Sequence, residues 1–494
     1  MIDSYLALAR CPEGPQYKNL GASRGIRHMR FPIAQLVACA ILLFTTETTQ
    51  AAPPERPAVS IVLKHDREGW TADYTFRKFA PVWFFQRSKD SIDKVQWRLA
   101  SFKVVTPGVA LSHLGNFDAL YRSDGRALRH VRIRVTPFSR PLRSDYAPAL
   151  TFSDGGLAFY THHFVVSPLA SVAVAKALPA SPDWDAIADA PATLTVRDKG
   201  NRLLVRGRVV EDAATIPLSG PDTYVYIGSG PLVATDHFAE IVDPGLPVWV
   251  RGQLDAFLPR LMEYYTERLG VPSGSKPTAL IAWEGAERPG MSIGGSVMDR
   301  LVVMAVSGRK MLEADPKTLA TLRAFFGHET SHFWIGQTLQ YSKPEEGWIT
   351  EGSADVLGIR ATQHLVQDYD PHPKLQQEMD DCLKLNGAGK PLSSAESRGD
   401  YKAQYACGAL LVLAAEAALK RENAYADALT FVRKLLDANR ADGVVTEADW
   451  LATFSQAAGP TVSSQVGESL SPSSFLKRCG RLTQRGLSGW SHHP

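Results

Sequence analysis

The chain has 494 residues, of which 45% are hydrophobic and 21% charged, an ordinary composition for a folded globular protein. Its length predicts about three domains. The formal charge is only +3, without a long basic block, so the sequence gives no reason to expect a nucleic-acid partner.

An apolar run near the N-terminus predicts export. Residues 31–44 follow the basic opening Met29-Arg30 and precede the small-residue sequence Thr49-Gln50-Ala51, which is the order of a cleaved signal peptide. The run is too short to span a membrane, so we expect no span once residues 29–51 are removed. The run that ends at Cys39 also resembles a lipoprotein box, but apolar residues continue past it. The pattern therefore favours export to the periplasm or the exterior over a lipid anchor, with residues 1–51 as upstream segment and signal peptide.

Strand patterns dominate residues 52–240, which we assign to an N-terminal β-sheet domain. Residues 131–135 alternate between apolar and charged side chains, as a half-buried strand does. Asp198-Lys199-Gly200-Asn201 lies between apolar runs at 193–196 and 203–205 and predicts a hairpin turn.

A second domain, residues 241–445, begins where Asp243-Pro244-Gly245 interrupts the strand pattern. A helix with apolar residues from Leu254 to Leu261 is expected to end at Gly270. Strands are expected at 279–283 and 301–306.

Two histidines and a glutamate follow at the spacing of a zinc hydrolase. Asp315-Pro316 predicts a helix start, and the helical pattern runs into Gly327-His328-Glu329-Thr330-Ser331-His332. On that helix His328 and His332 lie one turn apart on one face, where both can bind a single Zn²⁺. Glu329 can reach water at the metal without occupying a coordination position, which makes it the candidate general base.

A third ligand is expected from Glu351, since eighteen residues separate it from His332 on a second predicted helix at about 350–367. Two histidines and one glutamate leave the fourth position of a tetrahedral zinc open, which belongs to catalysis rather than to a closed structural site. Asp355, one turn beyond Glu351, is placed to orient a ligating histidine by accepting its other ring N–H.

These stretches resemble the aminopeptidase N family of zinc metallopeptidases, which includes leukotriene hydrolase. The run from His328 to Gly336 is similar to that family's HE-x-x-H-x-W-x-G motif, and the run from Trp348 to Gly358 to its W-x-x-E-G-x-A-(E/D)-x-x-G motif. The segment at Tyr405 resembles the family's Y-x-K-G-A motif, which implies that the Tyr405 phenol hydrogen-bonds the oxyanion. The resemblance implies one zinc ion, a peptide substrate and aminopeptidase activity. It also implies an α+β fold, with an N-terminal β-sheet domain, a thermolysin-like zinc metallopeptidase domain and C-terminal helices.

The chain departs from the family pattern at two places. Cys407 stands where the family usually has lysine. The family's G-x-M-E-N strand aligns the peptide and binds its free amine, and it has no intact copy here. The closest run upstream is 294–300, in which Met298-Asp299 could stand for the Met-Glu of the motif and Asp299 for the acid that binds the amine. Gly294 and Gly295 would allow close backbone approach by a substrate.

The C-terminal part is expected to be helical. Helices are predicted at 401–420 and 425–439, and Thr446 is a cap for another in the segment 446–494, which ends in a tail. Cys382, Cys407 and Cys479 remain after the leader is removed, and an oxidising compartment permits one disulfide among them. Cys382 with Cys407 is one choice, and the sequence leaves the pairing open.

Other functions remain open on the sequence alone. A non-catalytic binding or scaffold protein could keep zinc on a peptidase fold, although it would need neither Glu329 nor Tyr405. Glycyl aminopeptidases share HExxH and a tryptophan soon after it, and the altered G-x-M-E-N strand leaves an endopeptidase open. The sequence predicts neither the oligomeric state nor the preferred side chain of the substrate.

Overall fold

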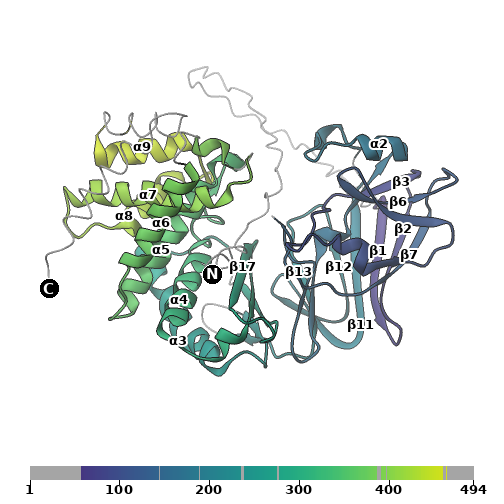
Figure 1. Cartoon of the computed structure of the whole chain (residues 1–494), viewed down its shortest axis with the longest axis horizontal. Helices are drawn as coiled ribbons and strands as arrows, with labels where there is room; N and C mark the ends of the chain where they lie inside the picture. Colours follow the sequence, from purple (N-terminus) through teal and green to yellow (C-terminus); the bar gives the residue numbers. More distant parts are fainter. Residues whose placement is uncertain are drawn as a thin grey trace, which may run out of the picture.

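The computed structural model describes residues 57–459 and residue 463, apart from 144, 189, 235–238, 275–276, 387–390 and 396–397. The predicted signal peptide with Cys39, the third cysteine Cys479 and almost all of the predicted tail lie outside the described residues. The described chain forms a β-rich first part and a largely helical second part, which lie beside each other in Figure 1.

Two packed sheets make up the first part. In its described strands, the larger sheet has the order β4-β7-β2-β1-β11-β13-β9-β8, with β12 paired to β11, and the smaller one β10-β3-β6-β5. The larger sheet contains β1 (Val59–Asp66), β2 (Gly69–Phe76), β4 (Phe102–Val104), β7 (His130–Val135), β8 (Ala149–Thr151), β9 (Leu157–Tyr160), β11 (Ala192–Val205), β12 (Arg208–Pro217) and β13 (Tyr224–Gly228). The smaller sheet contains β3 (Val82–Phe85), β5 (Val109–Leu114), β6 (Phe117–Arg122) and β10 (Val166–Leu169), and two short helices accompany them, α1 (Trp97–Ser101) and α2 (Val172–Ala177). Apolar side chains from both sheets form one shared core.

The strand predicted at 131–135 is confirmed as β7, which buries its apolar side chains and exposes the charged ones between them. The hairpin turn predicted at Asp198-Lys199-Gly200-Asn201 is wrong. Strand β11 continues through this sequence, which bulges between the pairs Arg197–Ala213 and Arg202–Glu211. The turn lies at Arg206-Gly207 instead, where φ is 48° and 76°, the left-handed conformation that two-residue hairpins require.

The second part begins with another sheet, in the order β14-β15-β16-β18-β17. Its described strands are β14 (Val233–Ala234), β15 (Ala239–Val242), β16 (Thr278–Trp283), β17 (Ser292–Met298) and β18 (Leu301–Ser307). Strands β16 and β18 match the predicted ones. Strand β15 extends across the expected domain boundary after residue 240 and pairs with β16.

Helices cover one face of this sheet and then continue as a bundle. They are α3 (Val248–Leu269), α4 (Pro316–Ser331), α5 (Trp348–Leu365), α6 (His372–Asn386), α7 (Tyr401–Lys420), α8 (Ala428–Asn439) and α9 (Glu447–Ala458), and a short parallel pair, β19 (Gln340–Tyr341) and β20 (Val444–Val445), lies among them. As predicted, α3 ends at Gly270, α7 spans 401–420, and α9 starts at a Thr446 cap. Trp450 and Phe454 of α9 belong to the same core as α3, α4 and α7, so α9 is part of the second part's main core.

One described helix, α7, is long and apolar enough to cross a membrane, but 78% of its apolar window is buried inside the protein. Its composition is therefore that of a central core helix.

The second sheet is covered on both faces. Ile281, Met304 and Val306 pack against the helices, whereas Leu280, Val303 and Met298 pack against tyrosines of the first part. Strand β17 is the last strand of this sheet, and Figure 1 shows it on the side of the second part that faces β13. A strand with one edge that pairs with no other described strand thus lies where the two parts meet.

Candidate metal centre

Helices α4 and α5 carry the predicted metal ligands. Helix α4 starts as expected, because the Asp315 carboxylate accepts hydrogen bonds from the backbone N–H groups of Lys317 and Thr318. His328 lies in its last turn, and His332 is the residue that ends it. Glu351 lies in the first turn of α5.

Close helix crossings bring these ligands together. A Cβ on Gly327 would lie 2.5 Å from the Cα of Gly358, so α4 and α5 cross with their backbones in contact. A Cβ on Gly352 would lie 2.2 Å from the carbonyl carbon of Gly408, so α5 and α7 cross in the same way. Any side chain at Gly327 or Gly352 would push these helices apart. The glycines of the sequence motifs therefore set the spacing of the site.

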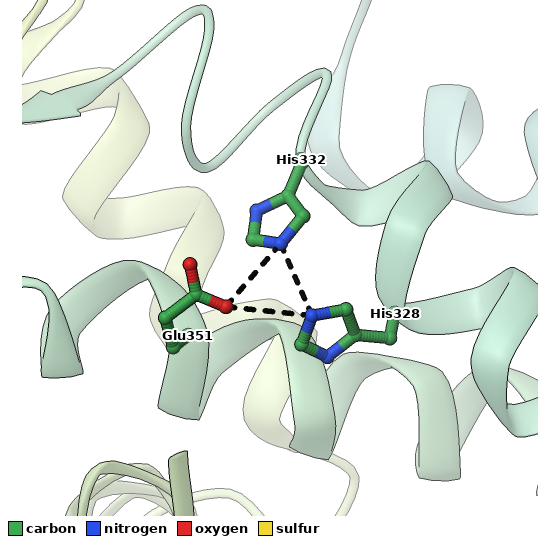
Figure 2. A group of neighbouring side chains, drawn as sticks. All are labelled: His328, His332 and Glu351. Carbon is green, nitrogen blue, oxygen red and sulfur yellow. Dashed lines mark hydrogen bonds and ion pairs between the residues drawn. The ribbon is translucent and has the colours of Figure 1, made fainter. Parts of the chain in front are cut away.

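The three predicted ligands converge on one point (Figure 2). The Nε2 atoms of His328 and His332 lie 3.1 Å apart, and Oε2 of Glu351 lies 3.4 Å and 3.5 Å from them. Zinc bonds of about 2.0–2.1 Å in tetrahedral geometry separate neighbouring ligands by about 3.3 Å. The three atoms thus already have the separations that a tetrahedral zinc requires.

The other nitrogens of the two imidazoles are held by hydrogen bonds. The Nδ1–H of His328 donates to Oδ1 of Asp355 at 2.8 Å, and the Nδ1–H of His332 donates to the backbone oxygen of Ile335 at 3.0 Å. With the proton on Nδ1, both Nε2 lone pairs point to the centre. Oε2 of Glu351 is buried there without a hydrogen-bond partner. Three electron-pair donors facing one another in a buried space fit a divalent cation.

The buried carboxylates of the site favour a cation between the ligands. Burial alone would lower the pKa of His328, but the charge and hydrogen bond of Asp355, together with Glu351, raise it well above its usual range. Burial would raise the pKa of Glu351, but the charges of His332 and His328 hold it well below its usual range. Surroundings that attract protons to two imidazoles also attract a metal cation in their place.

Glu329 lies beside the ligands and against the edge strand β17. A Cβ on Gly295 would lie 2.6 Å from Cζ of Phe325 and 3.0 Å from Cδ of Glu329, so no side chain fits between the strand and this carboxylate. Burial raises the pKa of Glu329, although His328 and His332 oppose the shift. Its Oε1 is buried without a hydrogen-bond partner. The structure therefore presents an uncommitted carboxylate next to the metal ligands.

Tyr405 approaches from α7. Its ring stacks on the imidazole of His328, with the ring centroids 5.7 Å apart. Two residues further on, Cys407 forms a disulfide with Cys382 of α6. This is the pairing that the sequence left as one choice, and it joins the helix of Tyr405 to its neighbour.

The remaining predicted residues fall at two different places. Gly294 and Gly295 lie in the middle of β17, and Gly295 is the one beside Glu329. Asp299 does not reach the site, because Met298 pairs with Leu301 and leaves Asp299-Arg300 as the turn of the β17–β18 hairpin. Asp299 lies four residues after Gly295 in the chain, about 13 Å away along the strand direction. The side chain of Asp299 is 46% exposed, and its Oδ1 lies 3.6 Å from Nε of Arg300.

Sequence reasoning missed two parts of the site. The Ile335 carbonyl that holds His332 carries no sequence signal, since every residue has a backbone oxygen. Phe325, which packs beside Gly295 and Glu329, precedes His328 by about one helical turn, and in the sequence it carries no signal beyond that of an apolar helix face.

No family model matches the chain, and no curated protein matches it. Solved structures do match. An aminopeptidase N family protein from Idiomarina loihiensis aligns with a TM-score of 0.57 at 11% identity, over 84% of this chain and 76% of that one. The M1 zinc metallopeptidase from Deinococcus radiodurans aligns with a TM-score of 0.42 at 15% identity, over 83% of this chain and 92% of that one. Native yeast LTA4 hydrolase aligns with a TM-score of 0.47 at 10% identity, over 83% of this chain and 66% of that one.

The first of these alignments carries the comparison. It extends through both parts of the chain, and the predicted α+β class is confirmed. The chain therefore has the fold of the aminopeptidase N family, as the resemblance of its motifs predicted.

Proposed function

We propose that the protein is a zinc metallopeptidase that hydrolyses peptide bonds. The observation that carries the proposal is the triangle of His328, His332 and Glu351, with separations of 3.1–3.5 Å, next to the uncommitted carboxylate of Glu329. A scaffold that kept zinc for structure would need the triangle but not the carboxylate.

A zinc ion held by His328, His332 and Glu351 would supply a Lewis acid that polarises a carbonyl and makes water acidic. Glu329 then takes the proton of the attacking water on its buried carboxylate, and the water oxygen bonds to the scissile carbonyl carbon. Glu329 passes this proton to the leaving nitrogen as the C–N bond breaks. Its raised pKa suits a group that must accept and release one proton per turnover.

Two further groups position the reaction. The Tyr405 hydroxyl donates a hydrogen bond to the oxyanion that forms from the scissile carbonyl. Asp355 holds the imidazole of His328 in the tautomer that presents Nε2 to the centre. An extended peptide pairs with the edge of β17, where Gly294 and Gly295 let its backbone come close to Glu329.

We also propose that the protein acts outside the cytoplasm. The apolar run that follows Met29 supports this, and so does the Cys382–Cys407 disulfide, because such bonds persist in oxidising compartments.

The test is Glu329→Gln. This change keeps the size of the side chain and removes its ability to accept a proton, so turnover of a peptide library should fall by roughly 10²–10⁴-fold while bound zinc is retained. Glu345→Gln, which alters an exposed acid in the loop before α5, is the matched control and should cleave as wild type does. Peptidase activity near wild type in Glu329→Gln would refute the proposed mechanism.

A further inference from the structure

The side of β17 that faces the metal centre carries no charge. Side chains alternate along a strand, so Ile293, Gly295 and Val297 share one face. Gly295 is directed at Glu329 and Phe325, and Ile293 and Val297 pack with the helical core. Met298, on the opposite face, packs toward the first part. The positions next to the scissile bond are therefore a glycine between two apolar residues.

A free peptide N-terminus is a cation and needs an anionic partner when it is taken out of water. Asp299, the acid that the sequence suggested for this role, lies at the hairpin tip, about 13 Å along the strand from Gly295. It cannot contact an amine that is one residue away from the scissile bond.

The described acids around the centre already have partners or tasks. Asp355 holds His328, Glu351 completes the ligand triangle, and Glu329 serves as the base. Glu378 of α6 pairs with Lys374 at 2.6 Å. Glu346 accepts hydrogen bonds from two backbone N–H groups.

The edge of β17 is also long enough to bind a peptide on both sides of the scissile bond. Three residues of the strand precede Gly295 and three follow it, about 10 Å in each direction. Within the described residues, β18 is the strand that pairs with β17, so no described strand covers its other edge. An aminopeptidase would need a barrier or an acidic side chain on this edge, one substrate residue before the scissile bond.

From these observations, we infer that the site accepts peptides with no free amine beside the scissile bond. Its substrates are internal or N-blocked peptide bonds, with uncharged segments against Ile293 and Val297. This inference rests on the proposed peptidase function and departs from the aminopeptidase activity that the motif resemblance implied.

The experiment compares two hexapeptides that differ only in N-terminal acetylation. For zinc-loaded wild type, kcat/KM for the two forms should agree within about threefold, since only an exposed charge separates them. Mass spectrometry of the products should show cleavage at internal bonds. Calorimetry should give dissociation constants for the two peptides and zinc-loaded Glu329→Gln that also agree within about threefold.

Two variants sharpen the comparison. Val297→Glu places an acid on the face that carries Gly295. In this variant, kcat/KM for the peptide with a free amine should exceed kcat/KM for the acetylated peptide by about 30-fold or more. Asp299→Asn is the control and should leave the ratio unchanged. If wild type rejects the acetylated peptide by 30-fold or more, or Asp299→Asn removes such a preference, the inference is overturned. If neither peptide is cleaved by zinc-loaded wild type, the proposed function fails, and the inference fails with it.

Discussion

At the scale of single residues, the site depends on which nitrogen of each imidazole carries the proton. Asp355 and the Ile335 carbonyl both accept from Nδ1, so neither histidine can turn its lone pair away from the centre. The Asp355 carboxylate orients the imidazole of His328 and also places a negative charge beside it, since its Oδ1 lies 2.8 Å from Nδ1 of that ring.

Asp355→Asn should weaken zinc binding by about 10–100-fold, because the amide removes the negative charge behind His328. Competition with a chelator measures the dissociation constant. Asp370→Asn, which alters an exposed acid beside His372, is the control and should bind zinc as wild type does. Equal zinc affinity in the two variants would show that Asp355 does not support His328.

At the scale of elements, the site is a product of how α4, α5 and α7 cross. The Gly327–Gly358 and Gly352–Gly408 contacts set the distances between helices, and a buried ion pair fixes α5 to α7. In this pair the Arg360 guanidinium donates two hydrogen bonds to the Glu416 carboxylate, at 2.9 Å and 3.0 Å.

Glu416→Gln should destabilise the protein strongly. It removes the carboxylate charge that pairs with the buried guanidinium of Arg360, a change that costs about 3–5 kcal/mol. The thermal unfolding midpoint should fall by several degrees. Asp437→Asn, which breaks the exposed pair with Arg433, should shift the midpoint far less, because such pairs contribute about 0–1 kcal/mol. Equal shifts would contradict a structural role for the buried pair.

Sequence patterns predicted the elements that depend on local signals. The Asp315 cap, the apolar helix at 401–420 and the spacing from His332 to Glu351 each act within a few turns of chain. The predictions that failed depend on tertiary register. The hairpin turn lies at Arg206-Gly207 rather than at the predicted position, because β11 pairs on both sides of its bulge. Asp299 lies in a turn away from the metal ligands, because β17 ends one residue before it.

At the scale of the whole molecule, the second sheet joins the two parts. One face carries the helices of the metal centre and the other packs on tyrosines of the first part. Glu284 follows β16 at the end of this sheet, where burial raises its pKa to about 7 in spite of Arg288. Tyr224 of the first part is close enough for the charge of Glu284 to raise the pKa of its phenol, although burial is the larger cause.

The raised pKa of Glu284 predicts a pH-dependent stability. The protonated acid is favoured in the folded protein, so its contribution to stability is complete below its ordinary pKa of 4.5 and is lost as pH rises through about 7. Glu284→Gln should therefore raise the unfolding midpoint at pH 8 and change it little at pH 5. Glu287→Gln, at an exposed neighbour, is the control. A gain at pH 5 equal to that at pH 8 would contradict the assignment.

The central claim is that His328, His332 and Glu351 form a single zinc site, and the zinc content of the purified chain tests it most directly. After dialysis against metal-free buffer, elemental analysis should find one zinc ion per chain in wild type and in Glu329→Gln. His332→Ala should retain almost none, because it removes one of three protein ligands. Wild type without zinc, or His332→Ala with the full amount, would contradict the site described by the 3.1–3.5 Å triangle.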